Sequence, residues 1–339
     1  MNKGDLSFER PLYSKGLKIM IVGIDVSKLK LDITVLLEKN KEKHKVFDNK
    51  LDGFIEITKW LDQLGIKTAH ICLEATGSYS EAVSLFLHQQ GHTVSIVNPA
   101  RIKAYGKSEG SRAKTDKVDS GVIARFCKAQ PPLAWNPPSA EEQALKDLYR
   151  CRQSLIEDQI RLSNRMEALD KTKASLKIWE ILLEDLKKIT KNVEAQINAL
   201  LEKDSYLGYQ VELLKTIPGI SDKTAVAILS ELPPLNSFKT AREAAAFAGL
   251  TPTVRQLGTS VRGRGSLSKA GNAQLRKALY MPAIVAKKNN PIVKQFCNRL
   301  GEKGKAKMVV IGAAMRKLLH IIFGVLKHQI PFAFSQQNP

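Results

Sequence analysis

Four carboxylates stand at positions where acidic side chains commonly do chemistry. Asp25 closes one apolar run and Glu74 closes another. Asp116 and Asp119 lie three residues apart, so they share one face if their segment is a helix. Carboxylate oxygens are ligands that Mg²⁺ prefers, and two such ions can stabilise both the attacking and the leaving oxygen of a phosphodiester exchange. The four acids therefore predict a two-metal site that acts on phosphate.

The distribution of charge predicts a polyanionic partner. The chain of 339 residues has a formal net charge of +20. From Lys239 to Lys327, 18 lysines and arginines accompany two acids, Glu243 and Glu302. Such asymmetry is typical of proteins that bind nucleic acid, although a solvated basic surface would give the same pattern.

The cysteines, the first residues and a late apolar stretch argue against other classes of protein. The four cysteines lie far apart without a CxxC pair, so we expect neither disulfides nor a zinc knuckle, and a reducing cytoplasm fits. The first ten residues are polar and charged, unlike a signal peptide. The stretch Met308–Leu326 contains Arg316 and Lys317, which indicates a buried amphipathic helix and no membrane partner.

Hydrophobic periodicity predicts an α/β domain in the first third of the chain. Strands and helices alternate after an initial hairpin, which places helices on the faces of a sheet. The predicted strands are 17–25, 30–37, 70–74 and 93–97, and the predicted helices are 52–65, 80–90 and 113–129. Residues 103–114 are rich in Gly, Ser and Lys and are expected to form a mobile loop.

A proline-rich segment, 130–138, predicts a domain boundary. Residues 139–204 contain neither Gly nor Pro, and four leucines recur there every seven residues: Leu148, Leu155, Leu162 and Leu169. This pattern predicts long helices, either as an antiparallel hairpin of one chain or as an intermolecular coiled coil. Residues 210–330 read as helical, with one loop-rich interruption at 251–268.

Three motifs resemble the DEDD signature of one family, and they lie at 23–28 (GIDVSK), 73–77 (LEATG) and 114–119 (KTDKVD). The family is that of insertion-sequence transposases of the IS-one-ten and IS-eleven-eleven type, related to Piv/MooV-type DNA invertases. The resemblance implies a RuvC-like, RNase H-like first domain. It also implies that one tetrad is both catalytic and metal-binding, with two Mg²⁺ ions, or Mn²⁺ in their place: Asp25, Glu74, Asp116 and Asp119.

A second block resembles the transposase domain of the same family, at 248–252, 258–263, 267–272 and 279–283. The resemblance extends over residues 18–328. The predicted organisation is a polar tail (1–16), a RuvC-like catalytic domain (17–135), a helical coiled-coil linker (139–204) and a mainly α-helical transposase domain (205–330).

The Gly-rich loop of this second block is expected to bind nucleic acid. Glycines allow the backbone to approach phosphate closely, and guanidinium groups match phosphate oxygens. The basic residues of the loop and of the helix after it are Arg255, Arg262, Arg264, Lys269 and Arg276. Further contacts are predicted just before the acidic helix, where a solvated loop is the alternative reading: Lys103, Lys107, Arg112 and Lys114.

A hydroxyl in the Gly-rich loop could be a nucleophile on a phosphodiester. The resemblance implies such a serine, which would form a covalent phosphoserine intermediate of either polarity. We assign it to Ser260, with Ser266 and Ser268 as alternatives, and Ser268 has a second reading as the cap of the following helix. Many family members carry the serine just before the first glycine of the loop, where this chain has Leu257.

Residues 216–225 resemble a helix-hairpin-helix turn, whose backbone N–H groups would contact a phosphate. A tight turn between two packed helices is the other interpretation.

The favoured hypothesis is a transposase or site-specific recombinase. The resemblance implies donor and target DNA as partners, a structured guide (bridge) RNA, a homo-oligomer built from dimers to a tetramer, and work at the nucleoid in a bacterial cytoplasm. The alternative is a RuvC-like junction-resolving endonuclease that uses water as its nucleophile. A non-catalytic nucleic-acid-binding protein would leave the four acids unexplained, because they lower affinity for a polyanion unless metals neutralise them.

Overall fold

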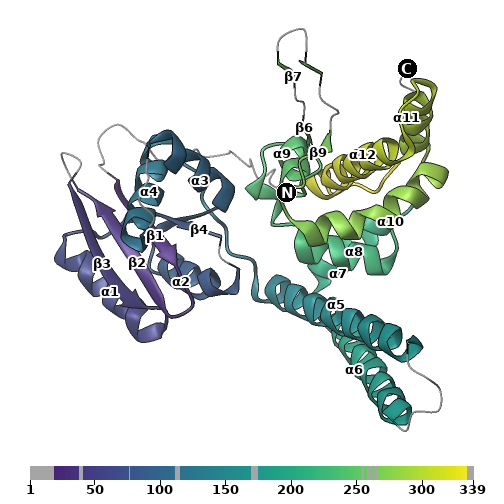
Figure 1. Cartoon of the computed structure of the whole chain (residues 1–339), viewed down its shortest axis with the longest axis horizontal. Coiled ribbons are helices and arrows are strands. Elements are labelled where there is room, and N and C mark those ends of the chain that lie inside the picture. Colours follow the sequence, from purple (N-terminus) through teal and green to yellow (C-terminus); the bar gives the residue numbers. More distant parts are fainter. Residues whose placement is uncertain are drawn as a thin grey trace, which may run out of the picture. The chain divides into compact units, whose positions relative to one another are not determined.

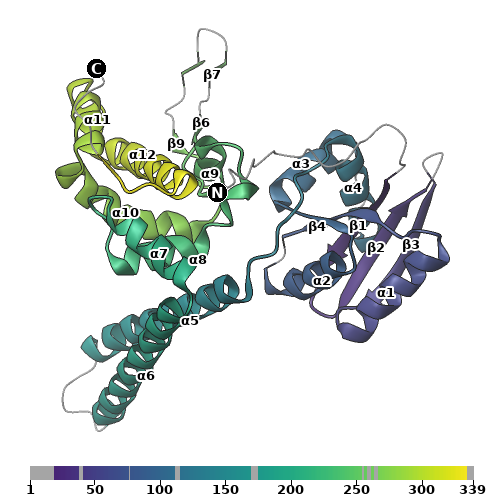
Figure 2. The same ribbon diagram turned by 180° about the vertical axis from the view of Figure 1, so that it is seen from behind.

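The computed structural model describes residues 19–37, 41–75, 77–110, 115–168, 175–253, 256–257, 261–262 and 266–333. The chain divides into two compact units, Met1–Pro137 and Pro138–Pro339 (Figures 1 and 2). Each unit has its own core and is described by itself.

The N-terminal unit is built on a five-stranded mixed sheet with the strand order β3-β2-β1-β4-β5. Strand β2 pairs antiparallel with β1 and with β3. Strand β4 pairs parallel with β1, and β5 pairs parallel with β4. The strands are β1 (Met20–Val26), β2 (Lys30–Leu36), β3 (Glu42–Asp48), β4 (Ala69–Glu74) and β5 (Thr93–Val97). The helices are α1 (Leu51–Gln63), α2 (Ser78–Gln89), α3 (Pro99–Ser108) and α4 (Asp116–Ala129).

Alternation along the strands produces two cores, one on each face of the sheet. Ile24 and Ile33 lie in the core with residues of α1 and α2. Ile21 lies in a second core, with Ile123 of α4 and Ile102 of α3. This period of two is why the sequence predicts the strands well. The expected α/β class of this unit is confirmed.

Helix α4 lies directly on β1 because Gly23 has no side chain. A Cβ atom at Gly23 would stand 2.3 Å from the Ser120 carbonyl oxygen and 2.4 Å from the Ala124 amide nitrogen. The Ser120 hydroxyl also lies 2.8 Å from the Thr34 hydroxyl, in a buried hydrogen bond to β2. Thr115 accepts a hydrogen bond from the Val118 amide, so the helix begins at the first residue of the acidic pair.

Two parts of the N-terminal unit differ from the sequence prediction. Strand β3 was not predicted, because it is an edge strand on which Phe47 alone is buried. The predicted mobile loop at 103–114 is wrong for residues 103–108, which belong to α3. Asn98 caps this helix by accepting from the Ala100 amide at 2.8 Å, and Pro99 stands in its first turn. The Asn98 cap and Pro99 favour the start of a helix here, even though the Gly, Ser and Lys content of the segment favours a loop.

The C-terminal unit is mostly helical, as expected. Its helices are α5 (Ala140–Glu167), α6 (Ser175–Lys203), α7 (Ser205–Lys215), α8 (Asp222–Glu231), α9 (Ala241–Phe247), α10 (Ala273–Asn289), α11 (Pro291–Glu302) and α12 (Lys307–His328). A short 3₁₀ turn, η2 (Leu235–Ser237), precedes α9. Four short strands form two small hairpin sheets, β6 (Pro252–Thr253) with β9 (Ser266–Leu267) and β7 (Gln256–Leu257) with β8 (Val261–Arg262).

Helices α5 and α6 form an antiparallel pair within one chain (Figure 1). Arg152 Nη2 lies 2.6 Å from Glu194 Oε1. About two turns further along α5, Gln159 Nε2 donates to Thr190 Oγ1 at 2.6 Å, and Thr190 precedes Glu194 in α6. The partners therefore run in opposite directions. Of the four leucines at heptad spacing, Leu162 is buried, Leu148 and Leu155 pack partly on the core, and Leu169 lies outside the described residues. An intermolecular coiled coil is not confirmed.

Helix α12 is the central core helix of the C-terminal unit. By length and composition it could cross a membrane. However, 56% of its most apolar 18-residue stretch is buried inside the protein. Its core residues include Leu318, Leu319 and Ile322, all fully buried. This burial agrees with the amphipathic core helix expected from the sequence. The four cysteines are free, as also expected.

We expect Gly23→Ala to destabilise the N-terminal unit. The added methyl group would meet two backbone atoms of α4, which cannot rotate away, so a loss of about 1–3 kcal/mol in unfolding free energy is expected. Thermal unfolding followed by circular dichroism measures it. Gly324→Ala in α12 is the control, because a Cβ there meets nothing within 4 Å and should be neutral or stabilising by up to about 1 kcal/mol. Equal stability of the two variants would contradict close packing at Gly23.

Candidate active site

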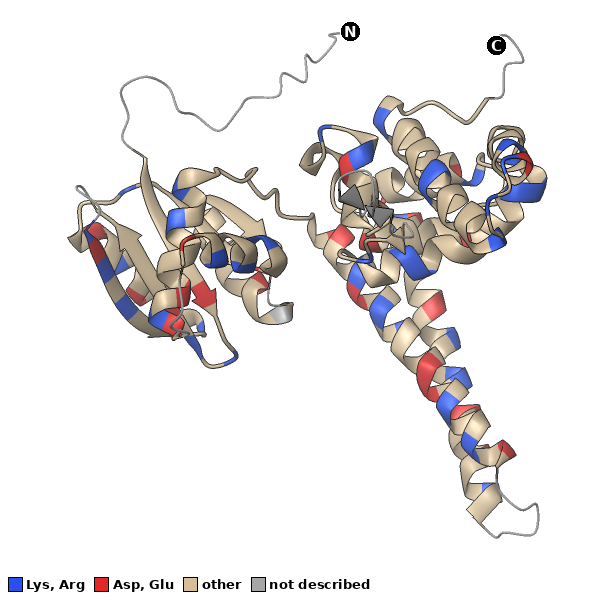
Figure 3. Cartoon of the chain, turned by 45° about the horizontal axis from the view of Figure 1, so that its top comes forward, with Lys and Arg blue, Asp and Glu red and all other residues tan. Residues whose placement is uncertain are grey.

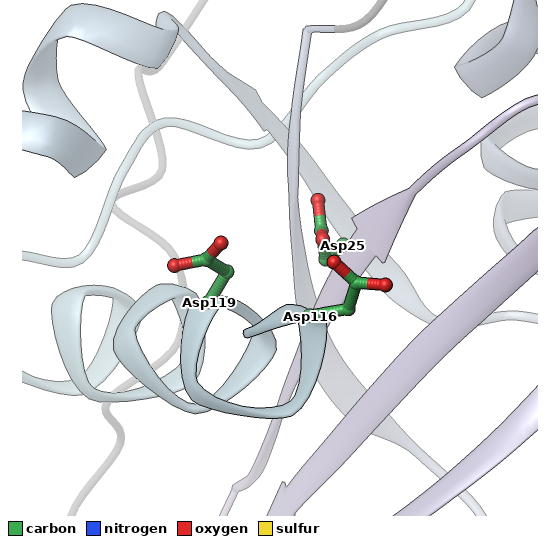
Figure 4. A group of neighbouring side chains, drawn as sticks. All are labelled: Asp25, Asp116 and Asp119. Atoms are coloured by element: carbon green, nitrogen blue, oxygen red, sulfur yellow. The ribbon is translucent and has the colours of Figure 1, made fainter. Parts of the chain in front are cut away.

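Three of the four predicted acids meet at one end of the sheet. Ligand oxygens of Asp25, Asp116 and Asp119 all lie within 4.8 Å of one another. Figure 4 shows two of these carboxylates on the first turn of α4, beside Asp25 on β1. The close approach at Gly23 makes this meeting possible, because it holds Ser120 and Ala124 of α4 against the strand two residues before the acid, and the first turn of α4 then lies beside Asp25. Sequence spacing alone predicts that Asp116 and Asp119 share a helix face, and the fold adds Asp25.

The fourth acid, Glu74, ends the neighbouring parallel strand. Ile24 of β1 is in register with Leu73 of β4. Asp25 and Glu74 therefore follow paired residues at the carboxyl ends of adjacent strands. The charge of Glu74 is also among those that raise the pKa of Asp25. The structure thus brings Glu74 to the same end of the sheet.

The position of Asp25 raises the pKa of its carboxyl. Burial and neighbouring negative charges together raise the pKa of its carboxyl from the ordinary value of 3.8 to about 6. Burial is the largest cause, followed by the charges of Asp119, Asp116, Glu74 and Asp32. Carboxylates packed so closely repel one another unless a cation lies among them. An all-oxygen donor set suits a hard divalent cation such as Mg²⁺ or Mn²⁺, so the residues fit the metal that the sequence predicts.

Three further residues lie near the acids and were not predicted from the sequence: a lysine, another aspartate and a histidine. Lys30 Nζ is 2.6 Å from Asp116 Oδ2 and 3.2 Å from Asp32 Oδ2. His44 Nε2 is 3.1 Å from Asp32 Oδ1. The contact with Lys30 lowers the pKa of Asp116. The signal was available, because alternation in the β1–β2 hairpin puts Asp25 and Asp32 directly opposite each other.

Most of the predicted serine loop lies outside the described residues. This holds for Ser260, Arg255 and Arg264, while Arg262 is placed in β8 without a described side chain. The base of the loop is described. The Ser266 hydroxyl lies 3.0 Å from the Thr253 hydroxyl across the β6–β9 pair.

The segment after the loop is held at a fixed place on the core. The Ser268 amide donates to the Thr251 carbonyl at 2.9 Å. Arg276 Nη1 donates to the carbonyl oxygens of Ala248 at 3.0 Å and Lys269 at 3.3 Å. Asn272, rather than Ser268, caps α10 by accepting from the Leu275 amide. The reading of Ser268 as that cap is therefore wrong.

The other predicted nucleic-acid contacts fall partly within the described chain. Lys103 and Lys107 are exposed on α3, one turn apart, whereas Arg112 and Lys114 lie outside the described residues. In the helix-hairpin-helix-like turn between α7 and α8, Gly219 has φ +106° and packs against Ala286 of α10. The turn is thus supported from behind by another helix.

A groove of about 690 Å³ opens among α5, α8, α10 and α12 of the C-terminal unit. Its walls are mainly apolar, and cationic and aromatic side chains contribute to them. These include Arg152, Lys223, Arg276, Lys277 and Tyr280. Figure 3 shows lysines and arginines spread over the helices of this unit. A groove that combines apolar, aromatic and cationic groups suits single-stranded nucleic acid, whose bases stack and whose phosphates attract cations.

The chain is similar to known transposases and recombinases over most of its length. A family described as Transposase matches residues 22–172, and one described as Transposase IS116/IS110/IS902 family matches residues 211–298. The pilin gene-inverting protein of Moraxella lacunata is 36% identical over 320 residues, which are 92% of this chain and 97% of that protein. The pilin gene-inverting protein of Moraxella bovis is 35% identical over 320 residues, again 92% of this chain and 97% of that protein. The transposase for insertion sequence element IS1328 of Yersinia enterocolitica is 26% identical over 79% of this chain and 84% of that protein.

Among solved structures, RuvC of Thermus thermophilus in complex with a Holliday junction substrate is similar to this chain with a TM-score of 0.26 and 12% identity. The match covers 34% of this chain and 97% of RuvC.

The fold, the site and these relatives define a DNA transposase or recombinase. The chain belongs to the DEDD transposase family of IS110 type, which also includes the pilin gene-inverting relatives. The family resemblance expected from the motifs is confirmed.

We expect Asp25→Asn to stabilise the metal-free protein in a pH-dependent way. The folded carboxyl keeps its proton up to about pH 6, whereas the unfolded one ionises near 3.8. Wild-type stability therefore falls as pH rises between these values, and asparagine cannot ionise. Above about pH 6 the variant should gain on the order of 1 kcal/mol, an estimate that allows for solvent screening. Urea unfolding in EDTA at a series of pH values measures the gain, and a gain that stays constant down to pH ~4 would contradict the raised pKa.

Proposed function

We propose that this enzyme cuts and rejoins DNA strands with Mg²⁺ held by Asp25, Glu74, Asp116 and Asp119, and with a serine of the Gly-rich loop as nucleophile. The observation that carries the proposal is the convergence of Asp25, Asp116 and Asp119 within 4.8 Å. Two Mg²⁺ ions, or Mn²⁺ in their place, would supply the positive charge that offsets negative charge on the attacking and leaving oxygens.

The acids and the serine have separate tasks in this proposal. Asp25 stands on a rigid strand, and Asp116 and Asp119 stand on a helix packed against it, so their oxygens are held in place before substrate arrives. The hydroxyl oxygen of Ser260 bonds to phosphorus while the bond to one deoxyribose oxygen breaks. The hydroxyl at the end of a different strand then bonds to the same phosphorus while the bond to the serine oxygen breaks, and the serine takes up the proton that this hydroxyl gives up. We propose that the serine comes from another protomer.

The partners in this proposal are donor DNA, target DNA and a structured guide RNA. The C-terminal unit supplies 18 lysines and arginines between Lys239 and Lys327, which suits contact with backbone phosphates. Sequence choice would lie in base pairing by the RNA, while the protein contacts backbone and shape. The enzyme would then work at the nucleoid of the bacterial cytoplasm.

The central experiment is recombination between donor and target plasmids, with and without the non-coding DNA that flanks the element. We expect exchange that requires the flank and disappears in Ser260→Ala, while DNA binding is retained. A covalent protein–DNA adduct should form in the wild type and be absent in the variant. Ser266→Ala and Ser268→Ala are matched controls, and loss of the adduct in one of them alone would move the assignment to that serine. Cleavage of branched DNA without an adduct would instead support a junction-resolving endonuclease.

The groove in the C-terminal unit is our proposed binding site for an unpaired stretch of the RNA. Tyr280→Ala should weaken RNA binding about 5-fold to 100-fold, because stacking of one base contributes about 1–3 kcal/mol. A filter-binding titration measures this change. Tyr206→Ala is the control, because Tyr206 is exposed on α7 and does not line the groove. If both variants bind RNA like the wild type, the groove is not the site.

The α5–α6 hairpin is our proposed assembly element. Several large apolar side chains are exposed on it: Ile160, Ile178, Ile181, Leu182 and Ile189. Ile178 and Ile181 are 67% and 64% exposed and lie on neighbouring positions of one helix face. Such a stripe suits a partner helix from a second copy of the chain.

Replacing Ile178 and Ile181 together by glutamate should reduce the mass of the assembly measured by light scattering, from a tetramer or dimer towards the monomer. Charges placed in an apolar interface lose hydration that the complex does not replace. The control replaces the adjacent exposed residues Lys177 and Glu180 by alanine. An unchanged mass for the glutamate variant would show that the stripe does not hold protomers together.

A further inference from the structure

One cation of the N-terminal unit lies in contact with the acidic cluster. Lys30 opens β2, and its ammonium group contacts two aspartates at once: Asp116 Oδ2 at 2.6 Å and Asp32 Oδ2 at 3.2 Å. Asp116 is one of the three acids whose oxygens converge. The lysine therefore occupies one oxygen of a carboxylate that is proposed to bind metal.

Asp32 is the fixed end of this contact. Its side chain is only 6% exposed, and it lies in register with Asp25 on the neighbouring strand. Both of its oxygens have partners, since Oδ1 faces His44 Nε2 at 3.1 Å and Oδ2 faces Lys30. A buried carboxylate whose two oxygens both have partners is costly to separate from them, so we treat Asp32 as an anchor rather than as a fifth metal ligand.

The two contacts of Lys30 differ in how easily they are lost. Lys30 and Asp116 are about half exposed, at 46% and 53%, so water can replace their contact at little cost. The contact with Asp116 is the shorter of the two. The loss of Lys30 nevertheless costs Asp32 more, because that carboxylate is buried and would be left with its contact to His44. A divalent cation that binds Asp116 would displace the ammonium group from that oxygen while the lysine stays tethered to Asp32.

We infer that Lys30 is a positioning residue of the metal centre: anchored on Asp32, it holds the Asp116 carboxylate beside Asp25 and Asp119 until a divalent cation displaces it. This inference rests on the proposed metal site. After displacement, the ammonium group has three N–H donors and keeps one of them on Asp32. The others remain beside the reaction centre, where a phosphate oxygen of DNA can accept them.

The inference is tested with Mn²⁺ alone as the probe, by measuring free Mn²⁺ with electron paramagnetic resonance during a titration. The comparison is between wild type, Lys30→Met and Lys30→Arg. Methionine keeps the apolar stem and removes the competing charge, so Lys30→Met should bind Mn²⁺ about 3-fold to 10-fold more tightly. Arginine keeps the charge and should restore the wild-type affinity.

Strand exchange at saturating Mn²⁺ provides the second readout. Lys30→Met should exchange strands more slowly than wild type even though its metal site is full, and Lys30→Arg should recover part of the rate. Lys50→Met is the matched control, because Lys50 is also exposed, contacts Asp48 at 3.1 Å, and has as its charged neighbours Asp48, Asp52 and Glu56, none of which belongs to the acidic cluster. Its Mn²⁺ affinity and exchange rate should equal those of the wild type. Circular dichroism of each variant checks the fold.

Two outcomes separate this inference from the proposed function. Unchanged or weaker Mn²⁺ binding by folded Lys30→Met, with wild-type binding intact, would overturn the role of Lys30 and leave the metal site standing. Asp119→Asn marks the opposite case, since it should lose Mn²⁺ affinity. If neither wild type nor any variant binds Mn²⁺, the metal site itself fails, and the inference about Lys30 fails with it.

Discussion

The packing of α4 on β1 at Gly23 is the constraint on which the rest of the site depends. Only hydrogen fits between the strand and the backbone of Ser120 and Ala124. That contact sets where α4 begins relative to the sheet, and Thr115 then caps it so that its first turn carries two acids. A helix held farther away by a side chain would separate the acids of α4 from Asp25, and no change in the acids themselves could restore their meeting.

The same closeness creates an electrostatic problem that the fold solves in two ways. The acids repel one another, and burial adds to the rise in the pKa of Asp25. A divalent cation removes the repulsion when it binds, and the tethered ammonium group of Lys30 offsets part of it beforehand. The +20 chain adds long-range attraction for polyanions, but those charges are screened within about 10 Å in salt and do not replace a local cation. In the mechanism that we propose, the site combines local neutralisation with basic residues that attract nucleic acid.

The sequence predicts the parts of the fold that follow from hydrophobic period, and it misses those set by contacts between distant segments. Strands β1, β2, β4 and β5 show buried alternation or short apolar runs, so their positions are readable. Strand β3 shows almost no such alternation, because most of its side chains face solvent at the sheet edge.

Asp25 and Glu74 are readable as acids at strand ends. The role of Gly23 is not, since it depends on α4, almost a hundred residues later. Lys30 and Asp32 are not predicted from the sequence, because a lysine that neutralises acids carries no motif of its own, and the placement of Ser260 stays a prediction.

The most direct test of the metal centre is a crystal structure of the protein soaked with Mn²⁺, with anomalous scattering recorded at the manganese absorption edge. The convergence of Asp25, Asp116 and Asp119 predicts one or two anomalous peaks among their carboxylates, with Glu74 beside them and Lys30 moved off Asp116. Peaks elsewhere, or a fully ordered site without manganese at millimolar concentration, would contradict a metal-dependent mechanism at this end of the sheet.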